Sequence, residues 1–155
     1  MSEKSSKQTI LVPVDFSAFS EAALVKACEL ADCIKLPIVI LHVVHDPSEL
    51  PGYYAKMTKK KNLVRMEDVA KEMFDEFMEM MLKNHPKLKA LAKAESMLVV
   101  GLPVGRILEV AKTVDAEMIV MGSQGHTGLK HMLLGSKAEQ VVRLSPVSVT
   151  IVKTK

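Results

Sequence analysis

The chain has 155 residues, of which 48% are hydrophobic and 25% charged, the composition of an ordinary globular domain, which excludes wholesale disorder. A formal net charge of +3, with two Tyr, four Phe and no Trp, does not favour a nucleic-acid-binding protein. The polar N-terminus lacks the apolar core of a signal peptide, and no apolar run approaches the length of a membrane span. We therefore expect one cytoplasmic domain over residues 1–155, with a flexible N-terminus over residues 1–8, no nucleic-acid partner and no membrane span.

Apolar runs alternate with segments of helical periodicity along the chain. In chain order we predict strand 9–14, helix 17–35, strand 38–44, helix 63–82, strand 95–100, helix 104–114, strand 117–121, helix 136–144 and strand 147–152. Ser17 or Ser20 is available as the N-cap of the first helix. Five strands that alternate with about four helices predict an α/β fold with a parallel, doubly wound sheet.

Two stretches depart from this rhythm. Residues 45–62 hold two Pro, a Gly, two Tyr and a run of three Lys, which predicts a mobile loop. The Met-rich helix 63–82 follows, and its apolar stripe is expected to pack in the core or against a partner. We place four residues in this stripe: Val69, Met73, Phe77 and Met81. The two cysteines, Cys28 and Cys33, lie on one predicted helix, and we expect both to be reduced thiols.

The segment 121–136, MGSQGHTGLKHMLLGS, carries the most specific motif of the chain. Its glycines Gly122, Gly125 and Gly135 have the spacing G-x2-G-x9-G and are followed at once by Ser136. A glycine-rich loop between a strand and a helix lets backbone N–H groups approach an anion closely, and the helix start adds unpaired donors. The motif therefore predicts that a phosphate-bearing ligand binds here.

Three predicted strand ends meet at the edge of the sheet where such ligands bind. Val43 and Met121 are apolar enough to flank an adenine ring. Asp15 is placed to accept hydrogen bonds from ribose hydroxyls or to lie near a phosphate-bound Mg²⁺, and it is expected to avoid the bare phosphates. The structural alternative is that Asp15 is only a turn residue or the N-cap of the first helix. We predict no other metal ligand.

The phosphates are expected along the glycine loop. Backbone N–H groups of Gly122, Gly125, Ser136 and Lys137, with the Ser136 hydroxyl, are placed to hold them. His126 lies inside the loop, within reach of the terminal phosphates, although a solvent-facing loop histidine is the simpler interpretation. His42, in the second strand, is expected to be a buried, hydrogen-bonded residue.

At these positions the sequence resembles the universal stress protein family. The resemblance covers almost the whole chain: ILVPVDFSAFSEAAL at residues 10–24, ILHVV, GLPVGRIL and the C-terminal segment from the glycine motif onward, residues 121–153. It implies a Rossmann-like fold with strand order 3-2-1-4-5, ATP or a related adenine nucleotide as ligand, and a homodimer formed through strand 147–152. The intact glycine signature is typical of the ATP-binding branch of the family. By motif, the resemblance places these residues around the nucleotide: Pro13, Val14 and Asp15 by the adenosine, Val43 and Met121 by the base, and Gly122, Gly125, Gly135, Ser136 and Lys137 by the ribose and phosphates.

The sequence favours binding over catalysis. It has no G-x4-G-K-[S/T] loop and no evident acidic pair to hold Mg²⁺ and orient a water. Our first hypothesis is therefore a regulatory protein, not an enzyme, whose contacts with an unidentified protein partner depend on bound ATP with Mg²⁺. One alternative is a weak Mg²⁺-dependent ATPase or phosphoryl-transfer enzyme. The other is a nucleotide-independent dimeric docking module that uses the Met-rich helix.

Overall fold

The computed structural model describes residues 8–45, 61–125 and 134–154, with side chains from residue 66 onward in the second of these stretches. Its elements follow one another in this order: β1 (Thr9–Pro13), α1 (Ala18–Ile34), β2 (Ile38–His45), α2 (Lys61–Asn84), α3 (Lys89–Lys93), β3 (Glu95–Gly101), α4 (Pro103–Thr113), β4 (Ala116–Gly122), α5 (Ser136–Leu144) and β5 (Ser148–Val152).

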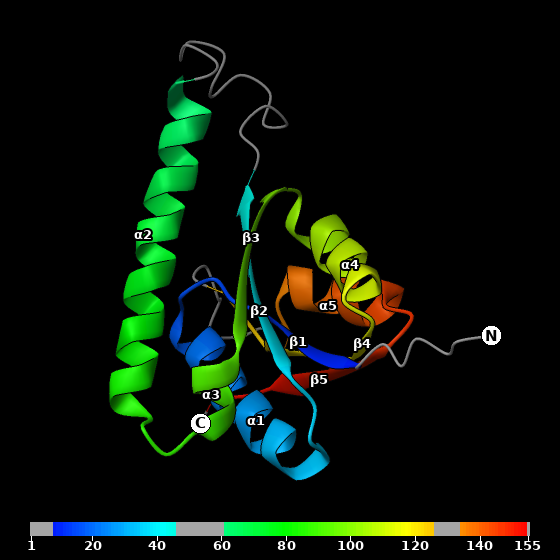
Figure 1. The fold of residues 1–155 in the computed structure, drawn as a ribbon. Helices are drawn as coiled ribbons and strands as arrows, with labels where there is room; N and C mark the ends of the chain where they lie inside the picture. The colour runs from blue at the N-terminus through cyan, green and yellow to red at the C-terminus, as the bar shows by residue number, and fades with distance from the viewer. Residues whose placement is uncertain (1–7, 46–60, 126–133, 155) are drawn as a thin grey trace, which may run out of the picture.

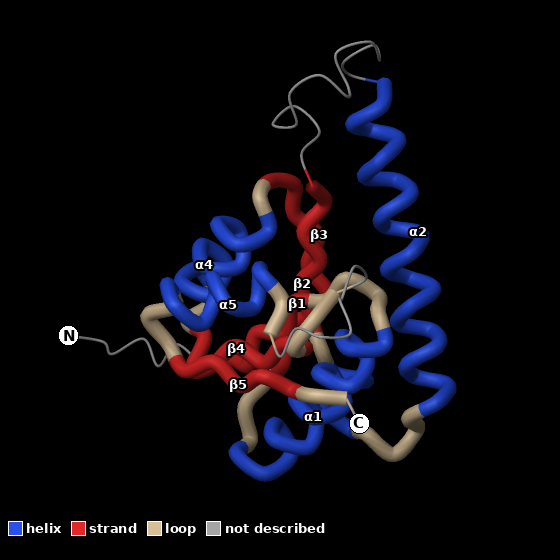
Figure 2. The backbone as a smooth tube through the Cα atoms, turned by 180° about the vertical axis from the view of Figure 1, so that it is seen from behind, coloured by secondary structure: helices blue, strands red, loops and turns tan. Residues whose placement is uncertain are grey.

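The five strands form one parallel sheet in the order β3-β2-β1-β4-β5, which confirms the predicted fold. Helices α1, α2 and α3 pack on one face of the sheet, and α4 and α5 pack on the other (Figures 1 and 2). Because successive side chains of a strand point to opposite faces, β1 contributes Ile10 and Val12 to the first core and Leu11 to the second. A sheet covered on both faces explains why its strands read as continuous apolar runs.

Helix α2 runs beside the sheet and extends past the carboxyl end of β2 (Figures 1 and 2). The start of the predicted apolar stripe does not pack in the core, because Val69 and Met73 are 51% and 46% exposed. The row that α2 buries is Ala70, Phe74, Phe77 and Met81. Each step of four residues overshoots a full helical turn by about 40°, so an uninterrupted i+4 series winds around the helix. The alternating steps of four, three and four residues keep the observed row on one face.

The other differences lie at element boundaries and in one short helix. Helix α3, absent from the prediction, is a fifth helix among the described residues, and its single turn is too short to show a period. The predicted mobile loop 45–62 begins and ends differently, since His45 closes β2 and residues 61–62 open α2. Residues 46–60 of that loop, and residues 1–7 of the predicted flexible terminus, lie outside the described residues. Of the helices that the structure describes, none is long and apolar enough to cross a membrane.

Candidate functional site

A cavity of about 430 Å³ lies at the carboxyl ends of β1, β2 and β4, within the size range of small-ligand sites. It sits at the switch point of the parallel sheet, where the strand order reverses: the chain leaves β1 for α1 on one face and leaves β4 for α5 on the other. Ten of the eleven residues predicted for ligand binding line this cavity: Pro13, Val14, Asp15, Val43, Met121, Gly122, Gly125, Gly135, Ser136 and Lys137. The remaining one, His126, lies outside the described residues.

The turn between β1 and α1 holds the Asp15 carboxylate in place. Asp15 Oδ1 accepts hydrogen bonds from the Ser17 backbone N–H (3.1 Å), the Ser17 hydroxyl and the Ser20 hydroxyl (2.7 Å). The Asp15 backbone N–H in turn donates to Ser20 Oγ at 2.8 Å. The N-cap of α1 is Ser17, not Asp15, because the Ser17 hydroxyl accepts from the Ser20 N–H. The carboxylate is thus both a turn-forming group and a fixed part of the cavity wall.

The signature glycines allow three close approaches around the cavity. A Cβ atom at Gly122 would lie 2.8 Å from Phe19 Cβ, so this glycine lets β4 pass against α1. A Cβ atom at Gly125 would lie 2.6 Å from Asp15 Oδ2, so the absence of a side chain there brings the loop up to the carboxylate. Gly135 donates its N–H to the Ser123 carbonyl at 2.6 Å, which ties the two ends of the loop together.

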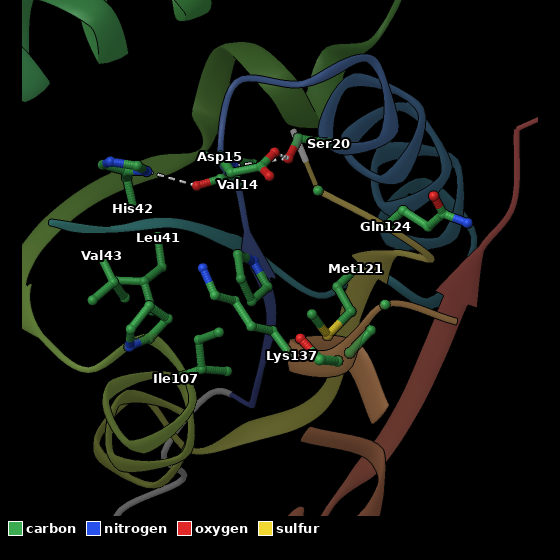
Figure 3. Close-up of a pocket in the computed structure, with 17 residues that line it drawn as sticks. Val14, Asp15, Ser20, Leu41, His42, Val43, Ile107, Met121, Gln124 and Lys137 are labelled. Carbon is green, nitrogen blue, oxygen red and sulfur yellow. Dashed lines mark hydrogen bonds between the residues drawn. The ribbon is translucent and has the colours of Figure 1, made fainter. Parts of the chain in front are cut away.

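One side of the cavity is suited to an anion. Helix α5 begins after Gly135 with no side-chain cap, so its first N–H groups and the positive end of its dipole face the site. Ser136 and Lys137 form the exposed first turn of this helix. The Lys137 side chain extends into the cavity (Figure 3). Helix start and ammonium group together create a positive region at this side.

Apolar side chains line much of the rest of the cavity. Val43 and Leu41 come from β2, Met121 comes from β4, and Ile107 comes from α4 (Figure 3). Apolar side chains that line a narrow site favour a flat, weakly polar group between them. The cavity therefore combines apolar side chains with a positively charged helix start, and Asp15 also lies in its wall.

His42 lines the cavity and forms a hydrogen bond to Val14, directly after β1. Its Nδ1 atom is 2.7 Å from the Val14 carbonyl oxygen, and since a carbonyl only accepts, Nδ1 carries the proton. Burial is the main cause that lowers the pKa of His42 below its ordinary value, and the nearby Lys137 charge lowers it further. The hydrogen bond to Val14 and the Asp15 charge act in the opposite direction. His42 is accordingly half-buried and hydrogen-bonded, and it is neutral at pH 7.

Sequence reasoning missed seven residues that line the cavity: Ser20, Leu41, His42, Pro103, Ile107, Gln124 and Ala138. Leu41, Gln124 and Ala138 adjoin or lie within predicted motifs, so a wider window around each motif would have found them. Pro103 directly precedes the predicted helix 104–114 and Ile107 lies within it, and only the three-dimensional placement of α4 brings them to the site.

The described residues offer no further metal site and no reactive buried thiol. Among the described residues, no group of three or more His, Cys, Asp or Glu side chains is placed to hold a metal ion. Cys28 and Cys33 are both free thiols, the first buried and the second exposed. Burial raises the pKa of Cys28 to about 12, so this thiol stays protonated and unreactive at neutral pH.

The fold is a Rossmann-like α/β domain with a cavity at its switch point. Residues 7–153 match the universal stress protein family, and the chain belongs to that family. It is 30% identical over 154 residues to universal stress protein MJ0577 of Methanocaldococcus jannaschii, an alignment that covers 94% of each chain. The solved structure of MJ0577 superposes with a TM-score of 0.70 at 28% identity, covering 97% of this chain and 98% of that one.

Two further solved structures contain adenine nucleotides. A universal stress protein in complex with cAMP is 27% identical with a TM-score of 0.65, covering 97% of this chain and 100% of that one. The universal stress protein of Archaeoglobus fulgidus in complex with dAMP is 25% identical with a TM-score of 0.58, covering 93% and 96% of the two chains.

Proposed function

We propose that this protein binds an adenine nucleotide, with ATP as the first candidate, in the cavity at the switch point. The observation that carries the proposal is that one cavity combines apolar side chains with an uncapped helix start. Adenine is flat and weakly polar, whereas the phosphates are anionic, so the two ends of the nucleotide match these two features. The cAMP and dAMP complexes of similar universal stress proteins support this choice of ligand.

The proposed nucleotide lies with its base between Val43 and Met121. Its ribose lies near Asp15, and Pro13 and Val14 contact the adenosine from the end of β1. The phosphates extend toward the helix start and are held by the sites predicted from the glycine motif: Gly122, Gly125, His126, Gly135, Ser136 and Lys137. Mg²⁺ would be bound through the phosphates and would neutralise part of their charge. Asp15, the one acidic side chain among the described lining residues, is the protein group that could reach it.

We propose regulation rather than catalysis as the role of the bound nucleotide. Phosphoryl transfer needs metal ligands and a further residue to orient the nucleophile, whereas a single carboxylate lines the described part of the cavity. The dimer implied by the family resemblance would form through β5, an edge strand that pairs only with β4 in the described sheet and is half-exposed over most of its length. Sedimentation tests this part: a monomer throughout the concentration range of the binding assays contradicts it.

A matched pair of glycine variants tests the nucleotide site. In Gly125→Ala the new methyl group meets Asp15 Oδ2 at 2.6 Å, and that carboxylate is held by three hydrogen bonds. The free protein relieves this overlap by moving the carboxylate away from the loop, and restoring the carboxylate on binding should cost about 1–3 kcal/mol, roughly a 5- to 150-fold rise in the Kd for MgATP measured by calorimetry. Gly105→Ala is the control, because nothing lies within 4 Å of its Cβ position. Equal affinities of the two variants would place the nucleotide elsewhere.

A further inference from the structure

Two neighbouring residues of the β1–α1 turn point to different parts of the protein. Asp15 lines the cavity, whereas the ring of Phe16 packs on the core beneath α2. Phe16 adopts a φ of 67°, a left-handed conformation that is uncommon for a bulky residue. Such a conformation is strained and persists only where the surrounding packing enforces it. A strained residue thus stands next to the carboxylate in the cavity wall.

The packing that enforces this conformation is a group of aromatic rings. The Phe16 ring stacks on His42, with ring centroids 4.3 Å apart and planes inclined by 30°. It also contacts two buried rings of α2, Phe74 at 5.8 Å and Phe77 at 5.5 Å between centroids. His42 in turn holds the Val14 carbonyl, which places the same ring against both the cavity wall and the aromatic group. Contacts therefore continue from the cavity to the buried side of α2.

We propose that Phe16 and His42 position the β1 end of the cavity wall and couple occupancy of the cavity to the packing of α2. The inference rests on the proposed nucleotide function and names the element that responds to it. A ligand that fixes the Asp15 carboxylate also fixes the adjacent Phe16 backbone, and with it the ring that α2 packs against. Helix α2 is suited to respond, because its first turns extend past the carboxyl end of β2 and its buried row includes both partner rings (Figure 1).

Hydrogen exchange with MgATP as the probe tests this coupling. Some α2 amides exchange through local opening of the helix. Saturating MgATP should slow the exchange of these amides about fivefold or more, a factor at the lower end of common coupling strengths. Phe16→Leu keeps an apolar side chain but removes the aromatic contacts, and Phe16 does not line the cavity. This variant should still bind MgATP, with an affinity lowered by about the same fivefold factor, and at saturation it should lose the slowing in α2. Val25→Ala, a truncation in the same core away from the aromatic group, should keep it.

The outcomes separate the inference from the function on which it rests. If the wild type binds MgATP without any slowing of exchange in α2, the coupling alone is overturned. The same holds if exchange in α2 slows as much in Phe16→Leu as in the wild type. No binding by a folded wild type overturns the proposed function, and the coupling with it. If Phe16→Leu does not fold, Phe74→Leu gives the reciprocal measurement from the α2 side. Because coupling between sites is reciprocal, this variant should bind MgATP about fivefold more weakly, and unchanged affinity overturns the inference.

Discussion

Gly122→Ala should destabilise the fold through a contact that has nothing to do with the ligand. The added Cβ would lie 2.8 Å from Phe19 Cβ, 2.9 Å from the Phe19 carbonyl oxygen and 3.0 Å from its carbonyl carbon. Two of these are backbone atoms and the third is fixed to the backbone of α1, so no side-chain rotation relieves the overlap. The helix must move from β4, at a cost typical of overpacked cores, about 1–3 kcal/mol. For a chain of this length the midpoint of thermal unfolding should fall by roughly 2–12 °C.

Urea denaturation of wild type, Gly122→Ala and Gly105→Ala measures this effect. Gly105 lies in the first turn of α4 with nothing within 4 Å of its Cβ position, so alanine there should leave stability unchanged or raise it by up to about 1 kcal/mol. The m-values should agree among the three proteins, which shows that the folded state is the one altered. Wild-type stability in Gly122→Ala, or equal losses in both variants, would refute the proposed contact with α1.

Two other predictions concern the α2 side of the sheet. Because burial lowers the pKa of His42 in the folded protein, the unfolded chain takes up the proton first as pH falls, and stability should decrease below the ordinary value of 6.5. Urea titrations from about pH 7.5 to about pH 5 should show a smaller decrease in His42→Phe, and parallel curves would contradict the buried, neutral imidazole. Phe74→Ala should cost about 3–5 kcal/mol, whereas Val69→Ala should stay within about 0.5 kcal/mol. Similar losses of stability in the two variants would contradict the observed burial and support the predicted stripe, in which Val69 packs in the core.

Local patterns were enough to predict the sheet and most of the helices. Each buried strand forms a continuous apolar run, and helix 136–144 has the predicted bounds. The local sequence patterns failed to predict helix α3 and the buried face of α2, where these patterns are weakest. Helix α3 is a single turn without a side-chain cap, so neither period nor capping marks it. The phase of α2 depends on which of its apolar residues the sheet meets, and the sequence offers more of them than one face can hold.

The residues of the candidate site also fall into a predicted group and a missed group. Most lining residues at strand ends or in the glycine motif were predicted, because the switch-point rule brings those ends together, although Leu41, Gln124 and Ala138 beside them were missed. Residues from α4 were missed, since Ile107 serves the core and the cavity at once. The conformation of Phe16 was equally out of reach, because packing against His42, Phe74 and Phe77 imposes a φ that no local preference predicts. The roles assigned to the lining residues stay predictions until a ligand is measured.

Calorimetric titration of nucleotide-free wild-type protein with MgATP tests the central claim most directly. Denaturing part of the purified protein first, and identifying any nucleotide that it releases, shows what must be removed before the titration. The account predicts saturable binding of one nucleotide per chain. A folded protein that gives no binding heat with MgATP, and none with AMP or cAMP, would contradict the assignment of this cavity as an adenine nucleotide site.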